Sequence, residues 1–141
     1  MAPGEVNVAR ARREVIDEIL RQARSAAPLE SCGLLLGSRN EAGEWLLDTA
    51  FAARNLLDSP TRFQVDPEDH FRAIRTARER GMAVVGAYHS HPASAAIPSP
   101  RDLAEALDAD LLYLIAGLPT AEVRAYRLHE GNFRPVELVP L

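Results

Sequence analysis

Apolar residues recur with a helical period in some segments of this 141-residue chain and form continuous or alternating runs in others. Residues 10–25 carry apolar side chains every three or four positions with charged residues between them, which predicts an amphipathic helix closed by Pro28. Residues 32–37 and 82–91 are short and almost wholly apolar. These two runs predict strands that are covered on both faces.

Turn-forming residues divide the rest of the chain into further short elements. Strands are expected at residues 44–53, 61–65, 111–116, 123–128 and 133–139. Two more helices are expected to begin at Asp66 and Ser99, because each is an N-cap residue followed directly by proline. The first of these is expected to end at Gly81. The expected core-facing residues are Phe71, Ile74 and Ala77 in the first helix and Leu103, Ala106 and Leu107 in the second.

The order of these elements favours the α/β class, a mixed sheet with flanking helices, in a single domain that spans residues 1–141. Hairpins are expected toward both ends of the chain. Residues 82–116 are expected to form a strand, a helix and a second strand. A crossover of this kind joins parallel strands, and it places the end of strand 82–91 where binding sites gather in sheets of this class.

Composition limits the kinds of binding partner and the cellular compartment that are expected for this protein. The formal net charge of −4 and the lack of a basic cluster argue against a nucleic-acid-binding surface. No run approaches about 20 apolar residues, so no membrane span is expected, and the chain does not open with an apolar run of signal-peptide length. Cys32 is the single cysteine, which excludes an internal disulfide and permits a reducing compartment. We therefore expect a cytoplasmic protein with a protein or small-molecule partner, and its oligomeric state is left open.

Two histidines and an aspartate carry the most specific chemical signal. His89 and His91 lie two residues apart at the end of a predicted strand, so their side chains project from the same face. Asp102 follows His91 after ten intervening residues and lies in the first turn of the helix that Ser99 begins. Two imidazoles and one carboxylate can form an open zinc site, whose fourth position is left for water. The spacing therefore predicts that His89, His91 and Asp102 bind Zn²⁺.

A hydrolase also needs a group that accepts the proton of the attacking water and a donor for the carbonyl oxygen. Glu30, which precedes the first buried strand, is the candidate base, and Ser99 is the candidate oxyanion donor. Spacing alone does not bring Glu30 to His89. Both residues also have a structural interpretation, Glu30 as a surface acid and Ser99 as the start of a helix that includes Asp102.

The other reactive and aromatic residues are assigned to structure. Cys32 lies in an apolar run and is expected to be a buried, inert thiol. His70 and His129 are expected at the surface. The aromatic residues expected to pack rather than to bind substrate are Trp45, Phe51, Phe63, Phe71 and Tyr88.

Together these residues resemble the JAMM metalloprotease family, the active branch of the MPN domains. Glu30 opens Glu-Ser-Cys-Gly-Leu-Leu-Leu-Gly, His89 opens His-Ser-His-Pro, and Ser99 opens Ser-Pro-Arg-Asp, in the order of the family pattern. The resemblance extends over residues 6–128. It implies an MPN fold of cytidine-deaminase-like architecture, with zinc on His89, His91 and Asp102. It also implies that Glu30 is the general base and proton shuttle and that Ser99 is the oxyanion donor.

The same resemblance implies a class of substrate. The family cleaves a peptide or isopeptide bond after the Gly-Gly tail of a ubiquitin-like protein. The brief segment 53–61 and the short connection after Ile97 leave no room for the long insertions of eukaryotic deubiquitinases. The chain therefore resembles the small bacterial members, which are associated with ubiquitin-fold sulfur-carrier proteins. Two alternatives stay open, a non-catalytic MPN scaffold and a zinc hydrolase that acts on a small amide.

Overall fold

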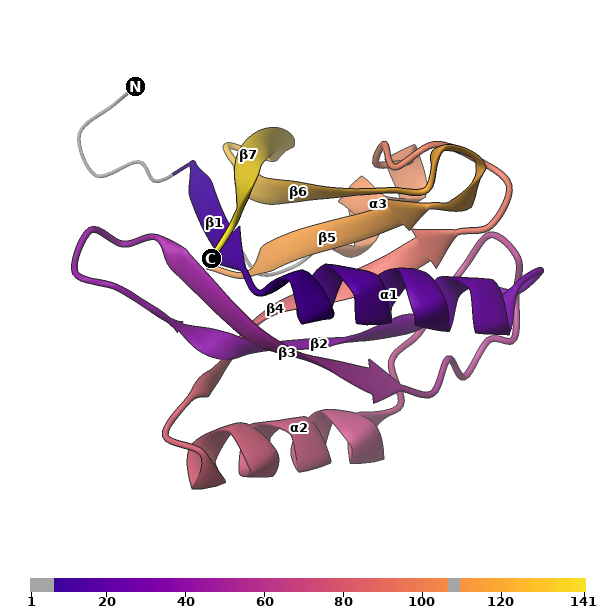
Figure 1. Cartoon of the computed structure of the whole chain (residues 1–141). Helices are drawn as coiled ribbons and strands as arrows, with labels where there is room; N and C mark the ends of the chain where they lie inside the picture. Colours follow the sequence, from indigo (N-terminus) through magenta and orange to yellow (C-terminus); the bar gives the residue numbers. More distant parts are fainter. Residues whose placement is uncertain (1–6, 107–109) are drawn as a thin grey trace.

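The computed structural model describes residues 7–106 and 110–141, which form seven strands, three α-helices and one short 3-10 helix (Figure 1). The strands are β1 (Val8–Ala11), β2 (Cys32–Arg39), β3 (Trp45–Ala53), β4 (Ala83–His91), β5 (Leu112–Gly117), β6 (Glu122–His129) and β7 (Asn132–Pro140). The helices are α1 (Arg13–Ala26), α2 (Pro67–Glu79), α3 (Pro100–Glu105) and the 3-10 helix η1 (Leu118–Thr120).

The strands pair into one mixed sheet that closes on itself, in the order β1-β3-β2-β4-β5-β6-β7. β4 and β5 run parallel, as the crossover predicts, whereas the β2–β3 and β6–β7 hairpins are antiparallel. β1 closes the sheet because it runs parallel to β3 on one side and to β7 on the other. The predicted α/β class with a mixed sheet and flanking helices is confirmed. The closure is a feature that the sequence pattern did not indicate.

The first strand occupies part of the segment predicted as helix. The prediction placed a helix at residues 10–25, but α1 begins at Arg13, and Val8–Ala11 form β1. Ala9 and Ala11 are buried while their neighbours are half-buried, as in a strand that turns alternate side chains to the core. Backbone pairing with two strands outweighs the helix preference of these residues, because local propensity is a weak contribution.

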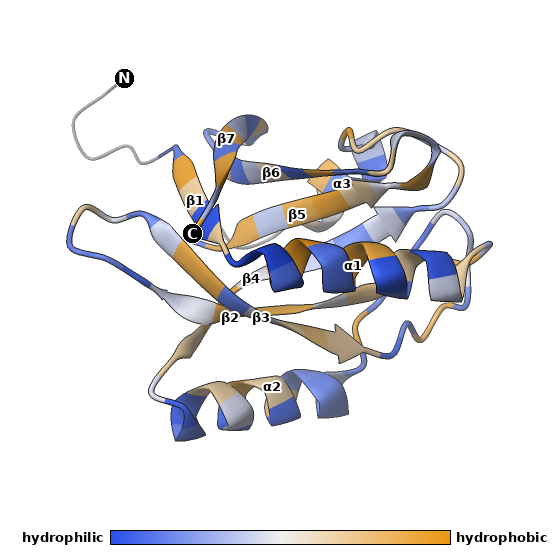
Figure 2. Cartoon of the chain, viewed as in Figure 1, coloured by the Kyte–Doolittle hydropathy of each residue, from blue (hydrophilic) through white to orange (hydrophobic). Residues whose placement is uncertain are grey.

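The two long helices cover opposite faces of the sheet, with α1 across its front and α2 below in Figure 1. α1 buries Val15, Ile19 and Ala23 in the main core, which also contains side chains of most strands. α2 packs on the other face through Ala73 and Ala77, against alternate residues of β2. Figure 2 shows both helices banded with polar and apolar residues, whereas β2 and β5 are apolar along most of their length. For β2 this agrees with the predicted strand covered on both faces.

The buried face of α2 differs from the predicted one. Phe71 is 66% exposed and Ile74 is 36% exposed. Ala77 is buried as predicted, and the other buried residues of the helix are Asp69 and Ala73. The small alanines let α2 approach the sheet closely, and the Asp69 carboxylate accepts a hydrogen bond of 2.7 Å from the backbone N–H of Arg54. This bond, the largest influence on the group, holds the pKa of Asp69 below its usual value and anchors the end of β3 to α2.

Residues 61–65 form a loop and not the predicted strand. Val65 makes a single antiparallel bridge with Asn55. The backbone pairing is limited to the bonds from Leu56 N–H to the Gln64 oxygen and from Asp66 N–H to the Arg54 oxygen. The side chain of Asn55 bonds the Arg62 oxygen and the Gln64 N–H in place of further strand pairing. The prediction failed because the alternating pattern of these residues does not reveal that a side chain takes the place of a partner strand.

The helix starts predicted at Asp66 and Ser99 and the helix end predicted at Gly81 are confirmed. The Asp66 side chain accepts a hydrogen bond from the backbone N–H of Glu68, and Gly81 follows α2 with a φ of +71°. α3 begins directly after Ser99. Leu107, a predicted core residue, lies outside the described residues. None of the helices in the described part of the chain is long and apolar enough to cross a membrane.

Candidate metal centre and active site

The two histidines lie at the carboxyl end of β4, where both are buried and project from the same face of the sheet. Their Nε2 atoms are 3.2 Å apart. α3 begins after the loop 92–98, and its first turn brings Asp102 to the pair. Oδ1 of Asp102 lies 3.1 Å from His89 Nε2, and Oδ2 lies 3.1 Å from His91 Nε2. The structure therefore brings together the three residues that the spacing selected.

The donor set of this cluster fits a divalent metal ion. Two imidazole nitrogens and a carboxylate oxygen, all of which have lone pairs, lie within 4.8 Å of one another. Ligand atoms held 2.0–2.1 Å from a tetrahedral zinc are about 3.3 Å apart, close to the 3.1–3.2 Å separations in the cluster. Without an ion, the imidazole nitrogens depend on the two oxygens of Asp102 as hydrogen-bond partners, whereas an ion can bind lone pairs of all three residues. The cluster is therefore a candidate metal centre.

The loop 92–98 fixes the ring of His91. Because a carbonyl can only accept, His91 Nδ1 donates its hydrogen bond of 2.9 Å to the oxygen of Ala95, and Nε2 is the nitrogen that faces the cluster. Gly117 on β5 lies opposite His91, and a Cβ atom at this position would come within 2.4 Å of Ala96 N. A glycine is needed there because the loop backbone lies directly against the sheet.

Electrostatic interactions inside the cluster oppose the effect of burial. Burial lowers the pKa of His91, but hydrogen bonds with Asp102 and with the oxygen of Ala95 raise it more, and the net pKa lies above its ordinary value. Burial raises the pKa of Asp102, but hydrogen bonds from both histidines and from the backbone N–H of Ser99 hold it well below its usual range. Asp102 is therefore an anion that stabilises positive charge on the imidazoles or on an ion between them.

Strand pairing brings Glu30 to the histidines, a step that spacing could not supply. β2 and β4 are antiparallel with Cys32 opposite His89, so Glu30, two residues before Cys32, comes level with His91. Glu30 is only 5% exposed, and its charge contributes to the raised pKa of His91. Glu30 is thus a buried acid beside the candidate metal centre and not the surface acid of the structural interpretation.

Ser90, between the two histidines, connects β4 to the residue that follows Glu30. Ser90 is fully buried, and its Oγ accepts hydrogen bonds from the backbone N–H of Ser31 at 2.8 Å and from Ser31 Oγ at 3.0 Å. The backbone N–H of Ser90 donates to the Ser31 oxygen at 3.0 Å. Sequence reasoning missed this role of Ser90. A polar residue at the buried end of an apolar strand was the signal that could have indicated it.

Ser99 has the capping role that the structural interpretation proposed. Its Oγ accepts a hydrogen bond of 3.1 Å from the backbone N–H of Asp102, and its own N–H donates to Asp102 Oδ2 at 2.8 Å. This capping box orients the carboxylate that faces the histidines. Because the cap uses only a lone pair of the hydroxyl, the O–H of Ser99 can still donate to a substrate oxygen.

Phe63 is an aromatic residue whose packing partner is part of the site. Its ring stacks on His89 with centroids 4.4 Å apart and planes inclined by 18°. Phe63, His89 and Asp102 border a cavity of about 160 Å³ that is otherwise lined by apolar and aromatic side chains. Cys32 is buried, and burial raises the pKa of its thiol to about 12, in agreement with the predicted inert role.

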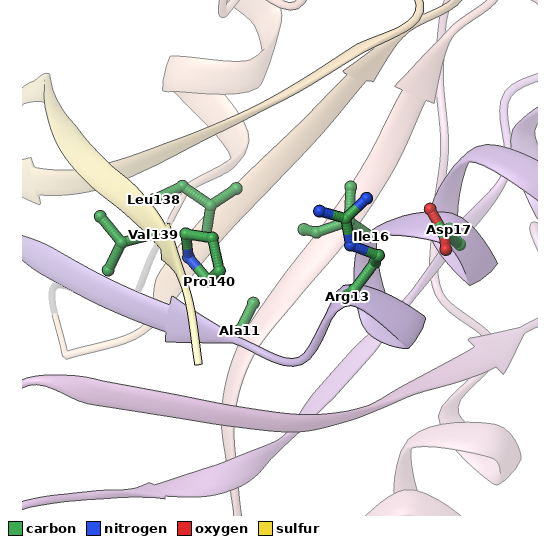
Figure 3. A pocket seen from close by; sticks show the side chains of 7 residues that line it. All are labelled: Ala11, Arg13, Ile16, Asp17, Leu138, Val139 and Pro140. Carbon is green, nitrogen blue, oxygen red and sulfur yellow. The ribbon is translucent and has the colours of Figure 1, made fainter.

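A second cavity, of about 260 Å³, lies between the start of α1 and the end of β7. Figure 3 shows Leu138 and Pro140 of β7 on one side of it and Ile16 and Arg13 of α1 on the other. Arg13 and Asp17 are its charged lining residues, and they form no ligand set for a metal. The 14 residues of α1, about 20 Å long, separate this cavity from the end of the helix that leads to Glu30.

The mixed sheet and the His-His-Asp cluster agree with a hydrolase of the JAB/MPN class, which the comparisons with known proteins support. The particular family follows from the sequence, since residues 12–129 match the model of the prokaryotic homologs of the JAB domain, Prok-JAB. The chain belongs to this family. The predicted resemblance to JAMM/MPN proteins is thereby confirmed.

Relatives and a solved structure agree with this assignment. The desampylase of Pyrococcus furiosus is 36% identical over 108 residues, which cover 77% of this chain and 73% of that protein. The probable TtuB-protein conjugate cleaving protease of Thermus thermophilus is 33% identical over 121 residues, which cover 85% of this chain and 76% of that protein. The solution structure of protein DSY2949 from Desulfitobacterium hafniense has a TM-score of 0.86 at 31% identity and covers 95% of this chain and 93% of its own.

We expect Ser90→Ala to lower the thermal unfolding temperature, because it leaves the buried N–H of Ser31 without its acceptor, at a cost of about 1–3 kcal/mol. Unfolding followed by circular dichroism measures the change. Ser38→Ala, at the exposed far end of β2, is the matched control and should unfold at the unsubstituted temperature. Equal unfolding temperatures for Ser90→Ala and the control would contradict this role.

Proposed function

We propose that this protein is a zinc-dependent metallopeptidase that hydrolyses a peptide or isopeptide bond after the C-terminal glycine of a ubiquitin-like or sulfur-carrier protein. The observation that carries the proposal is the convergence of His89, His91 and Asp102 at zinc-ligand spacing beside the buried Glu30. Burial of two acids around one cluster costs free energy that a bound cation offsets, so the arrangement favours metal chemistry over a purely structural role.

The proposed reaction uses five residues together with the metal. Zinc held by the two histidines and Asp102 would polarise the substrate carbonyl and acidify a water molecule. Glu30 would accept the proton of that water at a carboxylate oxygen and pass it to the leaving nitrogen. Ser99 would donate its O–H to the carbonyl oxygen, whose negative charge grows in the transition state. The bond from His91 Nδ1 to the Ala95 oxygen orients the ring so that Nε2 is the nitrogen that faces His89 and Asp102.

Similarity to the named relatives supports a protein conjugate as the substrate. The Thermus thermophilus relative is named for cleaving a TtuB-protein conjugate, and similarity over 85% of this chain extends that kind of substrate to it. A terminal glycine suits this site, because a residue without a Cβ lets the substrate backbone approach the buried donors closely.

Experiments can distinguish two alternative functions from the proposed one. A small-amide zinc hydrolase would use the same residues on a different substrate, and a non-catalytic scaffold would bind without turnover. We further propose that residues 1–141 act as one catalytic domain and that the reaction takes place in the cytoplasm. The buried free thiol of Cys32 is compatible with that compartment.

We expect His89→Ala and Asp102→Ala each to weaken zinc binding by more than about 100-fold. Loss of a residue that only hydrogen-bonds to a metal ligand costs about 10–100-fold, and these variants lose the ligand itself. The physical reason is that two protein donors are too few to hold the ion. Elemental analysis of the purified proteins and titration with Zn²⁺ measure the change. His70→Ala, at an exposed position of α2, is the control and should bind like the unsubstituted protein. Unchanged zinc content in both cluster variants would refute the ligand assignment.

We expect Glu30→Gln to retain zinc and to lower turnover by about 10²–10⁴-fold, because it removes the base and not a ligand. The substrate is a ubiquitin-fold sulfur-carrier protein with a C-terminal extension after its Gly-Gly, and the masses of the products show where it is cut. Glu41→Gln, at an exposed position between β2 and β3, is the control.

Each competing function has its own result in the Glu30 experiment. A scaffold leaves the carrier uncut by the unsubstituted protein. A small-amide hydrolase cuts a small acyl amide and leaves the carrier intact. Near-normal turnover by Glu30→Gln removes Glu30 from the mechanism, whatever the substrate.

We expect Ser99→Ala and Ser99→Gly both to lower kcat by about 10²-fold or more with zinc retained, because neither variant has an O–H donor. Glycine is an acceptable N-cap that costs only a few tenths of a kcal/mol relative to serine, so Ser99→Gly isolates the loss of the hydroxyl from the loss of the cap. Steady-state kinetics with the carrier substrate provide the comparison. A kcat near the unsubstituted value in Ser99→Gly alone would assign Ser99 to the helix cap.

A further inference from the structure

Asn55 lies at the start of the linking segment, residues 54–65, which connects β3 to α2. Its Nδ2 donates hydrogen bonds to the backbone oxygens of Glu30 and Arg62, both at 3.1 Å. Its Oδ1 accepts hydrogen bonds from the backbone N–H groups of Leu57 and Gln64, both at 3.0 Å. An asparagine side chain has two donor hydrogens and two acceptor lone pairs, so this carboxamide is fully used.

The linking segment holds the backbone of Glu30 on both sides of its Cα atom. The Glu30 oxygen accepts from Asn55, and the Glu30 N–H donates to the oxygen of Ser59 at 2.8 Å. Glu30 precedes β2, so it lies outside the regular hydrogen bonds of that strand. These two bonds therefore help to determine the direction in which its side chain leaves the backbone.

The carboxamide of Asn55 also connects Glu30 to the segment that packs against His89, a candidate zinc ligand. Arg62 and Gln64, both bonded to Asn55, flank Phe63 on either side. The ring of Phe63 lies on the ring of His89, with centroids 4.4 Å apart. The side chain of Asn55 is therefore bonded both to the backbone of Glu30 and to the segment that carries Phe63, which packs on His89.

We propose that Asn55 is a positioning residue of the reaction, whose carboxamide sets where the Glu30 carboxylate lies relative to His89. The inference rests on the proposed function, in which Glu30 is the general base. Asn55 acts through Glu30. A general base must lie within hydrogen-bond reach of the proton that it takes, and a misplacement of 1 Å can cost about 100-fold in rate.

Two substitutions and a matched control test this role in the full chain loaded with zinc. Asn55→Ala removes all four bonds. Asn55→Asp keeps the shape and the accepting oxygen, but it replaces the donor that faces Glu30 and Arg62 with an acceptor. Asn40→Ala is the control, because Asn40 also uses both ends of its carboxamide, on Glu44, at the opposite end of β2. The probe is a ubiquitin-fold carrier protein whose terminal Gly-Gly carries an aminomethylcoumarin amide.

We expect both Asn55 variants to lower kcat by about 10- to 100-fold, with KM and zinc affinity almost unchanged, because only the placement of the base is lost. Asn40→Ala should keep the kcat of the unsubstituted protein. In a Glu30→Gln background, Asn55→Ala should lower kcat by less than about threefold, since the group that it positions is already gone. A decrease of equal size in both backgrounds, or a kcat like that of the control, overturns the proposal.

Amide hydrogen exchange decides the same question without turnover. The Glu30 N–H should exchange at least about tenfold faster in Asn55→Ala than in the unsubstituted protein, while the amides of β7 are unchanged. If the unsubstituted protein cleaves no carrier, the proposed function fails, but faster exchange at Glu30 still supports the positioning contact. Unchanged exchange at Glu30 overturns it. Loss of cooperative unfolding in both Asn55 variants also overturns it, because Asn55 would then serve the fold and not the position of Glu30.

Discussion

The antiparallel pairing of β2 with β4 is the constraint on which the candidate site depends. Because Cys32 lies opposite His89, the buried acid Glu30 comes level with His91, although the two belong to distant parts of the chain. A slip of one residue in this pairing would turn every side chain of one strand to the other face and would separate the acid from the imidazoles. The hydrogen bonds between Ser31 and Ser90, which are 59 positions apart, oppose such a slip.

Around this pairing, the donor atoms are held by regular elements, and the loops are held through contacts with their backbone atoms. The histidines project from a central strand, and Asp102 is oriented by the capping box of α3. The loop 92–98 lies against Gly117, and its Ala96 oxygen accepts a hydrogen bond of 2.7 Å from Tyr126 Oη. Donors that are already in place lose little entropy when an ion or a substrate binds, so this support favours tight and well-oriented binding.

The features of the site that follow local rules are the ones that the sequence predicts. Two-residue spacing on a strand puts His89 and His91 on one face, and an N-cap followed by proline puts Asp102 in the first turn of a helix. The places of Glu30 and Ser90 depend instead on which strands pair and in which register, and spacing carries no information on either. For Glu30 the family resemblance supplied the link that the residues alone left open. β1 was not predicted for the same reason, because its four residues are extended through pairing with two neighbouring strands.

The loop at residues 61–65 shows why a local rule can fail next to a site. Its alternating pattern is that of a strand, but a strand would present its backbone to one neighbour along its whole length. Here the carboxamide of Asn55 bonds only selected backbone groups, so the chain is free to bend between them. The bend lets the segment place Phe63 on His89 while the oxygen of Ser59 reaches the N–H of Glu30. A straight strand could not make both contacts, which is a physical reason for an irregular backbone where the candidate base and the candidate ligand must be held together.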